Sequence, residues 1–253
     1  MLLLGYLLAL IIGLTLGVLG GGGSILTVPV FVYVLGYDPK LAIAMSLPVV
    51  GATSLVGAIG HWRAGHVRVP VTLVFGGVAM AAAFIAARLS VHLAGRVQLF
   101  IFSITMFTAA MLMLRDSLRP SAPAIPAGGR SSIPVALPLA GLAVGALTGL
   151  VGIGGGFLIV PALVVLAHMP MRQAVGTSLT VIAMNAVAGF AGQQSVGAIP
   201  LDFVITFSAI AMAGIVAGTW VGAYVHQRTL KRAFAVMLMV IAALLLWQNW
   251  AFL

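Results

Sequence analysis

The 253-residue sequence contains no cysteine and no glutamate, and its only acidic residues are Asp38, Asp116 and Asp202. The absence of cysteine excludes disulfides, thiol chemistry and cysteine-ligated metals. Acid–base and nucleophilic catalysis usually needs a carboxylate beside the reacting group, whereas these aspartates fall at the ends of apolar segments. We therefore expect no cofactor, no metal site and no enzymatic activity.

Charge of either sign is scarce, since only 6% of the residues are charged and 62% are hydrophobic. A soluble domain carries charge on roughly a quarter of its residues, so most of this surface must face lipid. The formal net charge of +9 needs no nucleic-acid partner, because basic residues gather on the cytoplasmic side of membrane proteins. The composition indicates an all-α polytopic membrane protein.

Apolar segments recur along the whole chain. A bilayer core of about 30 Å is crossed by roughly 20 helical residues, which suits most of these segments. Two of them, 2–35 and 134–168, are too long for a single crossing at about 1.5 Å per residue. The segments cover residues 2–35, 39–60, 69–91, 96–114, 134–168, 170–193, 201–225 and 228–250.

The two halves of the chain are related by an internal duplication. Aligning residues 13–70 with residues 145–202, a shift of 132 positions, gives 16 identities in 58 pairs. Such biased composition would give roughly one identity in ten, so the match indicates a repeat. We predict a repeat over 1–114, a Pro-, Ser- and Arg-rich linker over 115–133, and a second repeat over 134–253, each repeat with four segments.

The orientation of the two repeats can be tested against the basic residues. If each half crosses four times, the repeats are parallel and the twelve Lys and Arg residues divide seven to five between the two sides. If each long first segment instead folds back as a hairpin at its glycines, the repeats are inverted and the division is nine to three. The second division agrees better with the positive-inside rule and favours inverted repeats with both termini outside.

Contiguous glycines interrupt both long segments, at Gly20–Gly23 and in the stretch 152–156. Backbone without helical hydrogen bonds is tolerated in a membrane only where protein or water supplies partners. Broken helices at the interface of two repeats hold the substrate in many secondary transporters. We expect the second half-helices to start near Ser24 and Phe157, where unpaired N–H groups favour an anion. Glycines spaced four apart, such as Gly13 and Gly17, are equally well explained by helix packing.

The duplicated pattern resembles a known family. It reads G-x-x-x-G-x-x-G-x-G-G followed by V-P, then S-L at Ser46 and Ser178, then G-x-x-x-x-G. It is similar over nearly the whole chain to the sulfite exporter TauE/SafE family, also called the toluene sulfonate uptake permease group. The resemblance implies transport of small sulfur-containing or organic anions, such as sulfite, sulfoacetate or aromatic sulfonates, across a bacterial inner membrane.

Polar residues within apolar segments complete the predicted site, because such residues are costly in a membrane unless they have a role. Their alternative role is a hydrogen bond within their own helix. Ser46 and Thr53 lie seven residues apart, as do their equivalents Ser178 and Asn185, so each pair shares a helix face. The predicted substrate-binding residues are Gly20, Gly21, Gly22, Gly23, Ser24, Ser46, Thr53, His61, Gly152, Gly154, Gly155, Gly156, Ser178, Asn185 and Gln193.

The favoured function is therefore a secondary transporter, and export is favoured because the inside-negative potential drives anions outward. The expected partners are a small anionic substrate, the lipid bilayer and, if transport is coupled, a proton or sodium ion. An intramembrane hydrolase with Ser24 as nucleophile and a non-transporting membrane subunit are the alternatives. The sequence leaves the oligomeric state open.

Overall fold

The computed structural model describes residues 2–90, 92–118, 136–151, 156–192 and 199–250, and all regular structure within them is helical. Six helical segments are long and apolar enough to cross a membrane, which confirms the multi-pass all-α prediction. In the first half they are α3 (Pro39–Arg63), the segment of α4 (Val69–Val71), η2 (Thr72–Gly76) and α5 (Gly77–Ser90), and α6 (Gly95–Leu118). In the second half they are α9 (Met171–Gly192), α10 (Leu201–Tyr224) and α11 (Gln227–Trp250).

The two segments that are too long for one crossing are each divided into shorter helices. The first consists of α1 (Leu2–Leu19), α2 (Ser24–Pro29) and η1 (Val30–Val34). The second consists of α7 (Ala136–Val151), α8 (Gly156–Pro161) and η3 (Ala162–Leu166). A methyl group on Gly5 would lie 3.2 Å from Leu35 Cδ2, so the chain beyond η1 has returned to the start of α1.

A proline marks the same local change of helix in both repeats. Pro29 and Pro161 end α2 and α8, and each is followed by five residues of π-helix. Proline cannot donate the amide hydrogen of the regular i−4 pattern, and its ring crowds the preceding turn. The sequences that follow, VFVYV and ALVVL, share only one residue in register, so the widened turn is set by the prolines rather than by their neighbours.

The contacts between helices are equivalent in the two repeats when residue numbers are shifted by 132. Helix α1 packs on α10 and α7 packs on α5, while α3 packs on α9 and α6 on α11. A methyl group on Gly13 would overlap the backbone at Ala211, and one on Gly145 would overlap the backbone at Ala79. Since 145 is 13 plus 132 and 211 is 79 plus 132, these are equivalent contacts. Each first helix thus packs against the opposite repeat.

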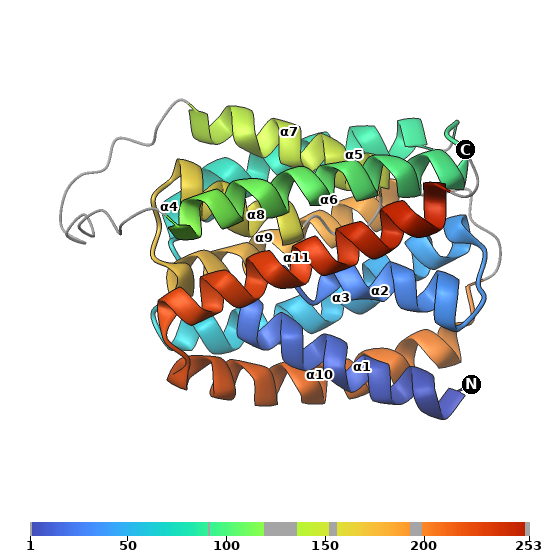
Figure 1. The fold of residues 1–253 in the computed structure, drawn as a ribbon, viewed down its shortest axis with the longest axis horizontal. Helices are drawn as coiled ribbons and strands as arrows, with labels where there is room; N and C mark the ends of the chain where they lie inside the picture. The colour runs from blue at the N-terminus through green and yellow to red at the C-terminus, as the bar shows by residue number, and fades with distance from the viewer. Residues whose placement is uncertain (1, 91, 119–135, 152–155, 193–198, 251–253) are drawn as a thin grey trace.

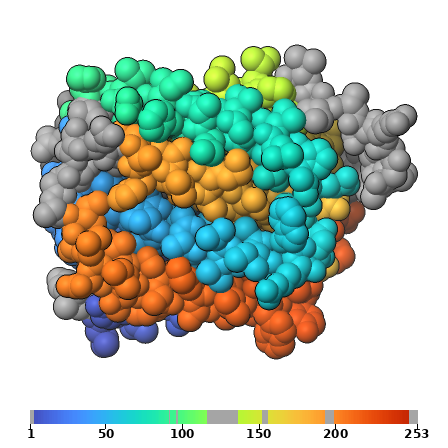
Figure 2. Space-filling view, turned by 180° about the vertical axis from the view of Figure 1, so that it is seen from behind, coloured from blue at the N-terminus to red at the C-terminus, as the bar shows by residue number. Residues whose placement is uncertain are grey.

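The helices run roughly along one common direction (Figure 1). The first turn of α1 and the last turn of α11 lie at one end of the molecule, and the end of α6 and the start of α7 lie at the other (Figure 1). On the opposite face, α10, α3, α9 and α5 follow one another in that order (Figure 2). The predicted linker 115–133 begins within helix α6, which continues to Leu118, and its remainder lies outside the described residues.

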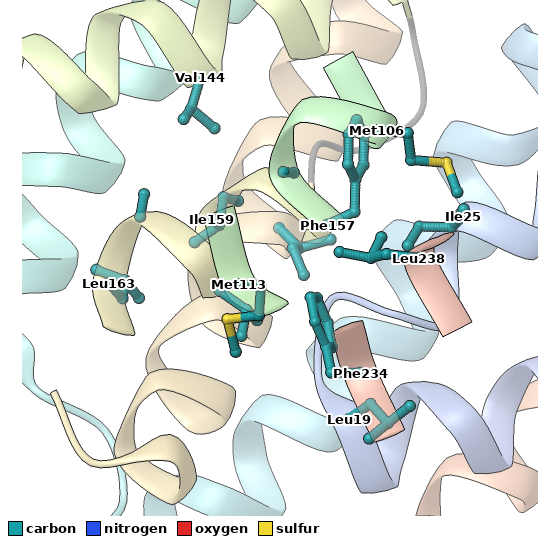
Figure 3. Packing of buried hydrophobic residues seen from close by; sticks show 14 of the residues in the cluster. Leu19, Ile25, Met106, Met113, Val144, Phe157, Ile159, Leu163, Phe234 and Leu238 are labelled. Atoms are coloured by element: carbon teal, nitrogen blue, oxygen red, sulfur yellow. The ribbon is translucent and has the colours of Figure 1, made fainter. Parts of the chain in front are cut away.

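The short helices α2 and α8 occupy the interior. Ile25 of α2 and Phe157 of α8 are buried beside Met106 of α6 and Leu238 of α11 (Figure 3). Ile25 and Phe157 are equivalent under the repeat, and so are Met106 and Leu238. On their other side α2 packs on α3, and α8 packs on α9. Helices α2 and α8 are therefore enclosed between α6 and α11 on one side and α3 and α9 on the other.

Candidate functional site

The glycines of the first cluster, Gly20–Gly23, are needed for two different structural reasons. Gly20 has a φ of +70°, a left-handed conformation that side chains rarely adopt, and it ends α1. Gly23 has helical angles, with φ −67° and ψ −31°, so its need for glycine is steric. A Cβ on Gly23 would overlap the backbone of Ile12 and Leu16 in α1. One glycine turns the chain, and another lets the returning segment approach α1.

The two glycine breaks touch one another. A Cβ on Gly21 would overlap the backbone of Gly156, and a methyl group on Gly156 would lie 2.7 Å from Gly21 Cα. Both residues are buried. Two predicted site residues that are 135 positions apart in the chain are therefore in direct backbone contact, and the contact joins the first repeat to the second.

The amide groups at the start of α2 are largely paired. The Ile25 N–H donates to the Gly22 carbonyl at 3.3 Å, and the Leu26 N–H donates to the Gly23 carbonyl at 3.2 Å. The Ser24 hydroxyl donates to the Gly21 carbonyl at 2.7 Å. The expectation that this half-helix offers a row of unpaired amides is therefore wrong for Ile25 and Leu26, because the glycines before the helix supply carbonyl partners.

One face of α9 lies against both breaks. A methyl group on Gly20 would lie 3.1 Å from Ser178 Oγ, and one on Gly156 would lie 2.6 Å from Ile182 Cδ1. Asn185 follows Ile182 by three residues and Ser178 by seven, so it continues the same helical face. Ser178 thus lies beside the first glycine cluster, and Asn185 lies two turns further along the same face of α9.

The equivalent residues of α3, Ser46 and Thr53, are also buried. Their hydroxyls donate within the helix, Ser46 to the Ile43 carbonyl at 2.7 Å and Thr53 to the Val49 carbonyl at 2.5 Å. Ser178 likewise donates to Val175 at 2.8 Å. These bonds match the alternative role considered for these residues, although a hydroxyl that donates to its own helix can still accept a hydrogen bond.

Asn185 differs from these hydroxyls. Its side chain is 0% exposed, and neither Oδ1 nor Nδ2 has a hydrogen-bond partner. An unpaired buried amide is costly, and in native proteins such a group calls for an explanation. Among the fully buried predicted side chains on α3 and α9, Asn185 is the one with both polar atoms unpaired.

His61 lies in the last turn of α3, beside the start of α9. A methyl group on Gly176 would lie 2.9 Å from His61 Cβ, and the rings of His61 and His66 are 5.7 Å apart. Neither ring nitrogen of His61 has a hydrogen-bond partner. The following loop is held to α9, since Arg68 Nε donates to Gln173 Oε1 at 2.9 Å. Of the other predicted site residues, Gly152, Gly154, Gly155 and Gln193 lie outside the described residues.

Two residues that the sequence did not single out share the character of Asn185. Thr27 on α2 and Ser54 on α3 are each 0% exposed, and neither hydroxyl has a hydrogen-bond partner. Their position in apolar segments was visible in the sequence, but serines and threonines there usually bond to their own helix. Only the three-dimensional structure distinguishes the hydroxyls that do so from those that do not.

No fixed charge is buried in the described part of the chain. Its buried polar side chains are those of serine, threonine, glutamine and asparagine. The interior elements carry no ionisable side chain in their sequences either, over residues 7–32, 41–60, 136–167 and 173–192. Any polar solute at the contact between the breaks would therefore meet neutral hydrogen-bonding groups.

Comparison with known proteins agrees with this architecture. A sequence model of the sulfite exporter TauE/SafE family matches residues 5–245. The chain belongs to this family. It is 31% identical over 248 residues to the "Probable membrane transporter protein" of Xylella fastidiosa (strain Temecula1), covering 95% of this chain and 93% of that relative.

A second TauE/SafE relative is the "Probable membrane transporter protein YdhB" of Bacillus subtilis (strain 168). The two chains are 28% identical over 223 residues, which cover 88% of this chain and 87% of the relative. No solved structure matches the chain significantly. The family assignment and the six long apolar helices together identify a multi-pass membrane transporter with a small-molecule substrate.

Proposed function

We propose that this TauE/SafE protein is a secondary transporter that exports small sulfur-containing or organic anions, such as sulfite, sulfoacetate or other sulfonates, across the bacterial inner membrane. The solute binds near the bilayer midplane, where the glycine breaks of two inverted repeats meet. The observation that carries the proposal is the backbone contact between Gly21 and Gly156. Transporters with broken helices at a repeat interface bind their substrates at such points.

The proposed inversion is supported by the number and direction of the helices. Each half has three long helices and one pair of short apolar helices. Leu35 returns to Gly5, as expected if the first pair is a hairpin that does not cross. An odd number of crossings per half turns the second repeat over. The predicted nine-to-three division of basic residues then puts the larger group in the cytoplasm.

Export is supported by electrostatics. An anion that leaves the cell moves down the inside-negative potential, which is worth about 2.3 kcal/mol per charge per 100 mV. The excess of Arg and Lys on the proposed cytoplasmic side would also raise the local concentration of anions there. Both effects favour movement from the cytoplasm outward.

The contact between the breaks supports a role for the predicted residues around it. Gly21 and Gly156 form the contact, and Gly20, Gly22, Gly23 and Ser24 adjoin Gly21 in the chain. Ser178 and Asn185 share one face of α9, and Ser46 and Thr53 occupy equivalent places on α3. We assign these residues to substrate binding. His61, beside Gly176, is assigned to the cytoplasmic approach to the site.

The proposal is tested with purified protein in liposomes. Wild-type protein should carry radiolabelled sulfite and sulfoacetate down an imposed gradient, whereas protein-free liposomes should not. The Gly21→Ala protein should lose this flux, because its methyl group would push the two breaks apart. The matched control is Gly77→Ala on α5, since a methyl group there meets nothing within 4 Å. Absence of flux from the folded wild-type protein for every small anion tried would refute the function.

A further inference from the structure

We infer that Thr27, Ser54 and Asn185 bind the solute through neutral hydrogen bonds, and that among the proposed substrates the site therefore prefers singly charged anions to doubly charged ones. The inference rests on the proposed transport function and adds to it two binding residues and a charge preference. It begins from a comparison of two groups of buried hydroxyls.

In the first group the hydroxyl donates to a backbone carbonyl three or four residues earlier in the chain. Ser103 does so to Leu99 at 2.8 Å, and Thr148 does so to Val144 at 2.6 Å. The same arrangement is found at Ser24, Ser46, Thr53, Ser90 and Ser178. A helical serine or threonine has this bond available without any other partner.

The second group consists of Thr27 and Ser54, whose hydroxyls forgo this bond although both side chains are 0% exposed. Asn185, also 0% exposed, leaves both atoms of its amide unpaired. Buried polar groups in native proteins have partners in the great majority of cases. Gln98 Oε1 is also buried and unpaired, but Gln98 Nε2 still donates to the Leu150 carbonyl at 3.0 Å. Thr27, Ser54 and Asn185 are thus the expected positions for hydrogen bonds to a solute.

These three residues belong to the helices that meet at the glycine breaks. Thr27 is one turn beyond Ser24 on α2. Ser54 lies between two contacts of α3 with α9. A methyl group on Gly51 would be 3.0 Å from Ala186 Cβ, and one on Gly57 would be 3.1 Å from Leu179 Cδ1. Asn185 extends the face of α9 that meets Gly20 and Gly156. The three therefore belong to α2, α3 and α9, the helices beside the proposed binding region.

The lack of buried charge then limits what can bind. The free energy of moving an ion out of water rises with the square of its charge, so a dianion costs about four times as much as a monoanion of equal size. Hydroxyl and amide groups compensate a single delocalised charge, as hydrogen bonds to charged groups are strong. They compensate the second charge of a buried dianion less well than fixed positive charges would. The preferred solute is therefore a monoanion.

The charge preference is tested with two anions of the same shape in liposomes containing the wild-type protein. Methanesulfonate carries one charge at every pH used, whereas methylphosphonate gains a second charge as the pH rises through the neutral range. Methanesulfonate flux should be the same at the two ends of that range. Methylphosphonate flux should approach it at the acidic end and fall at least tenfold at the alkaline end. Equal flux of the two anions at the alkaline end would overturn the charge preference.

The binding residues are tested with Thr27→Val, Ser54→Ala and Asn185→Leu, each measured for methanesulfonate flux and for thermal stability. Loss of a hydrogen bond to a charged solute should lower transport efficiency roughly ten- to hundredfold. Stability should stay the same or rise, because each substitution removes an unpaired buried polar group. The matched controls, Thr148→Val and Ser103→Ala, should show the reverse pattern, with full transport and slightly lower stability.

The outcomes separate this inference from the proposed function. If the three variants fold and transport methanesulfonate like the wild type, the binding residues are wrong while transport stands. If wild-type protein moves neither anion nor sulfite, the proposed function itself fails. A variant that unfolds is replaced by the conservative change at the same position, Thr27→Ser, Ser54→Thr or Asn185→Gln, which keeps a polar group. Methanesulfonate flux retained by these conservative variants supports the inference. Loss of that flux in all three conservative variants, at native stability, overturns it.

Discussion

Gly21 in the first repeat lies directly against the backbone of Gly156 in the second, so the breaks in the two long segments touch. The contact leaves no room for a Cβ on either residue. It links the turn before α2 to the first residue of α8, and both residues are buried.

The first prediction concerns Gly156→Ala. The new methyl group would lie 2.6 Å from Ile182 Cδ1 and 2.7 Å from Gly21 Cα. We expect a loss of about 1–3 kcal/mol in the free energy of unfolding, as is typical of overpacking. Adding Ile182→Val removes the first clash but not the second, so it should restore only part of the loss. Reversible unfolding in detergent measures both effects, and Gly77→Ala serves as the unhindered control.

The second prediction tests the equivalence of the repeats. Gly13→Ala and Gly145→Ala each place a methyl group on the backbone of the opposite repeat, at Ala211 and Ala79. Because the contacts are equivalent, the two substitutions should destabilise the protein by similar amounts, again about 1–3 kcal/mol. Thermal unfolding of the two variants side by side provides the measurement. A large effect of one and none of the other would contradict the symmetric packing.

The third prediction concerns a turn that follows the short helices. Gly36 and its equivalent His168 both have left-handed backbone angles, with φ +74° and +47°. Residues other than glycine adopt this conformation at a cost of about 1–2 kcal/mol. Gly36→Ala should therefore lower stability by about that amount, although a methyl group there meets nothing within 4 Å. His168→Gly should have the opposite sign or no effect, and chemical denaturation of both variants would show it.

The fourth prediction tests the orientation of the repeats, and the absence of cysteine makes the measurement direct. His92 and His226 are exposed and lie in equivalent loops, after α5 and after α10. With inverted repeats, His92→Cys should react with a membrane-impermeant maleimide applied outside intact cells, and His226→Cys should react only after the cells are opened. Labelling of both from the same side would instead indicate parallel repeats.

Much of the fold could be predicted because lipid imposes strong rules on sequence. The apolar segments, the duplication and the end of α1 at Gly20 follow from segment length and residue pattern. The start of α2 at Ser24 agrees with the expected position. The sequence also places Ser178 and Asn185 on one helix face, and the structure puts Ser178 beside Gly20.

The sequence could not predict which polar groups have partners. Ser46 and Ser54 look alike in an apolar helix, yet Ser46 donates to Ile43 whereas the Ser54 hydroxyl has no partner. Nor could it show that the glycines before α2 accept hydrogen bonds from Ile25 and Leu26. Both outcomes depend on rotamers and on carbonyl directions, which are fixed only when the helices pack.

The sequence by itself determined that this chain lies in a membrane, is built from two related halves and carries no ionisable side chain in the elements at its centre. These properties follow from composition and spacing, which persist in any conformation. Only the tertiary structure decided that Gly21 meets Gly156 and that each first helix packs on the opposite repeat. Contacts between residues more than a hundred positions apart arise from the packing of whole helices, and local sequence patterns do not specify that packing.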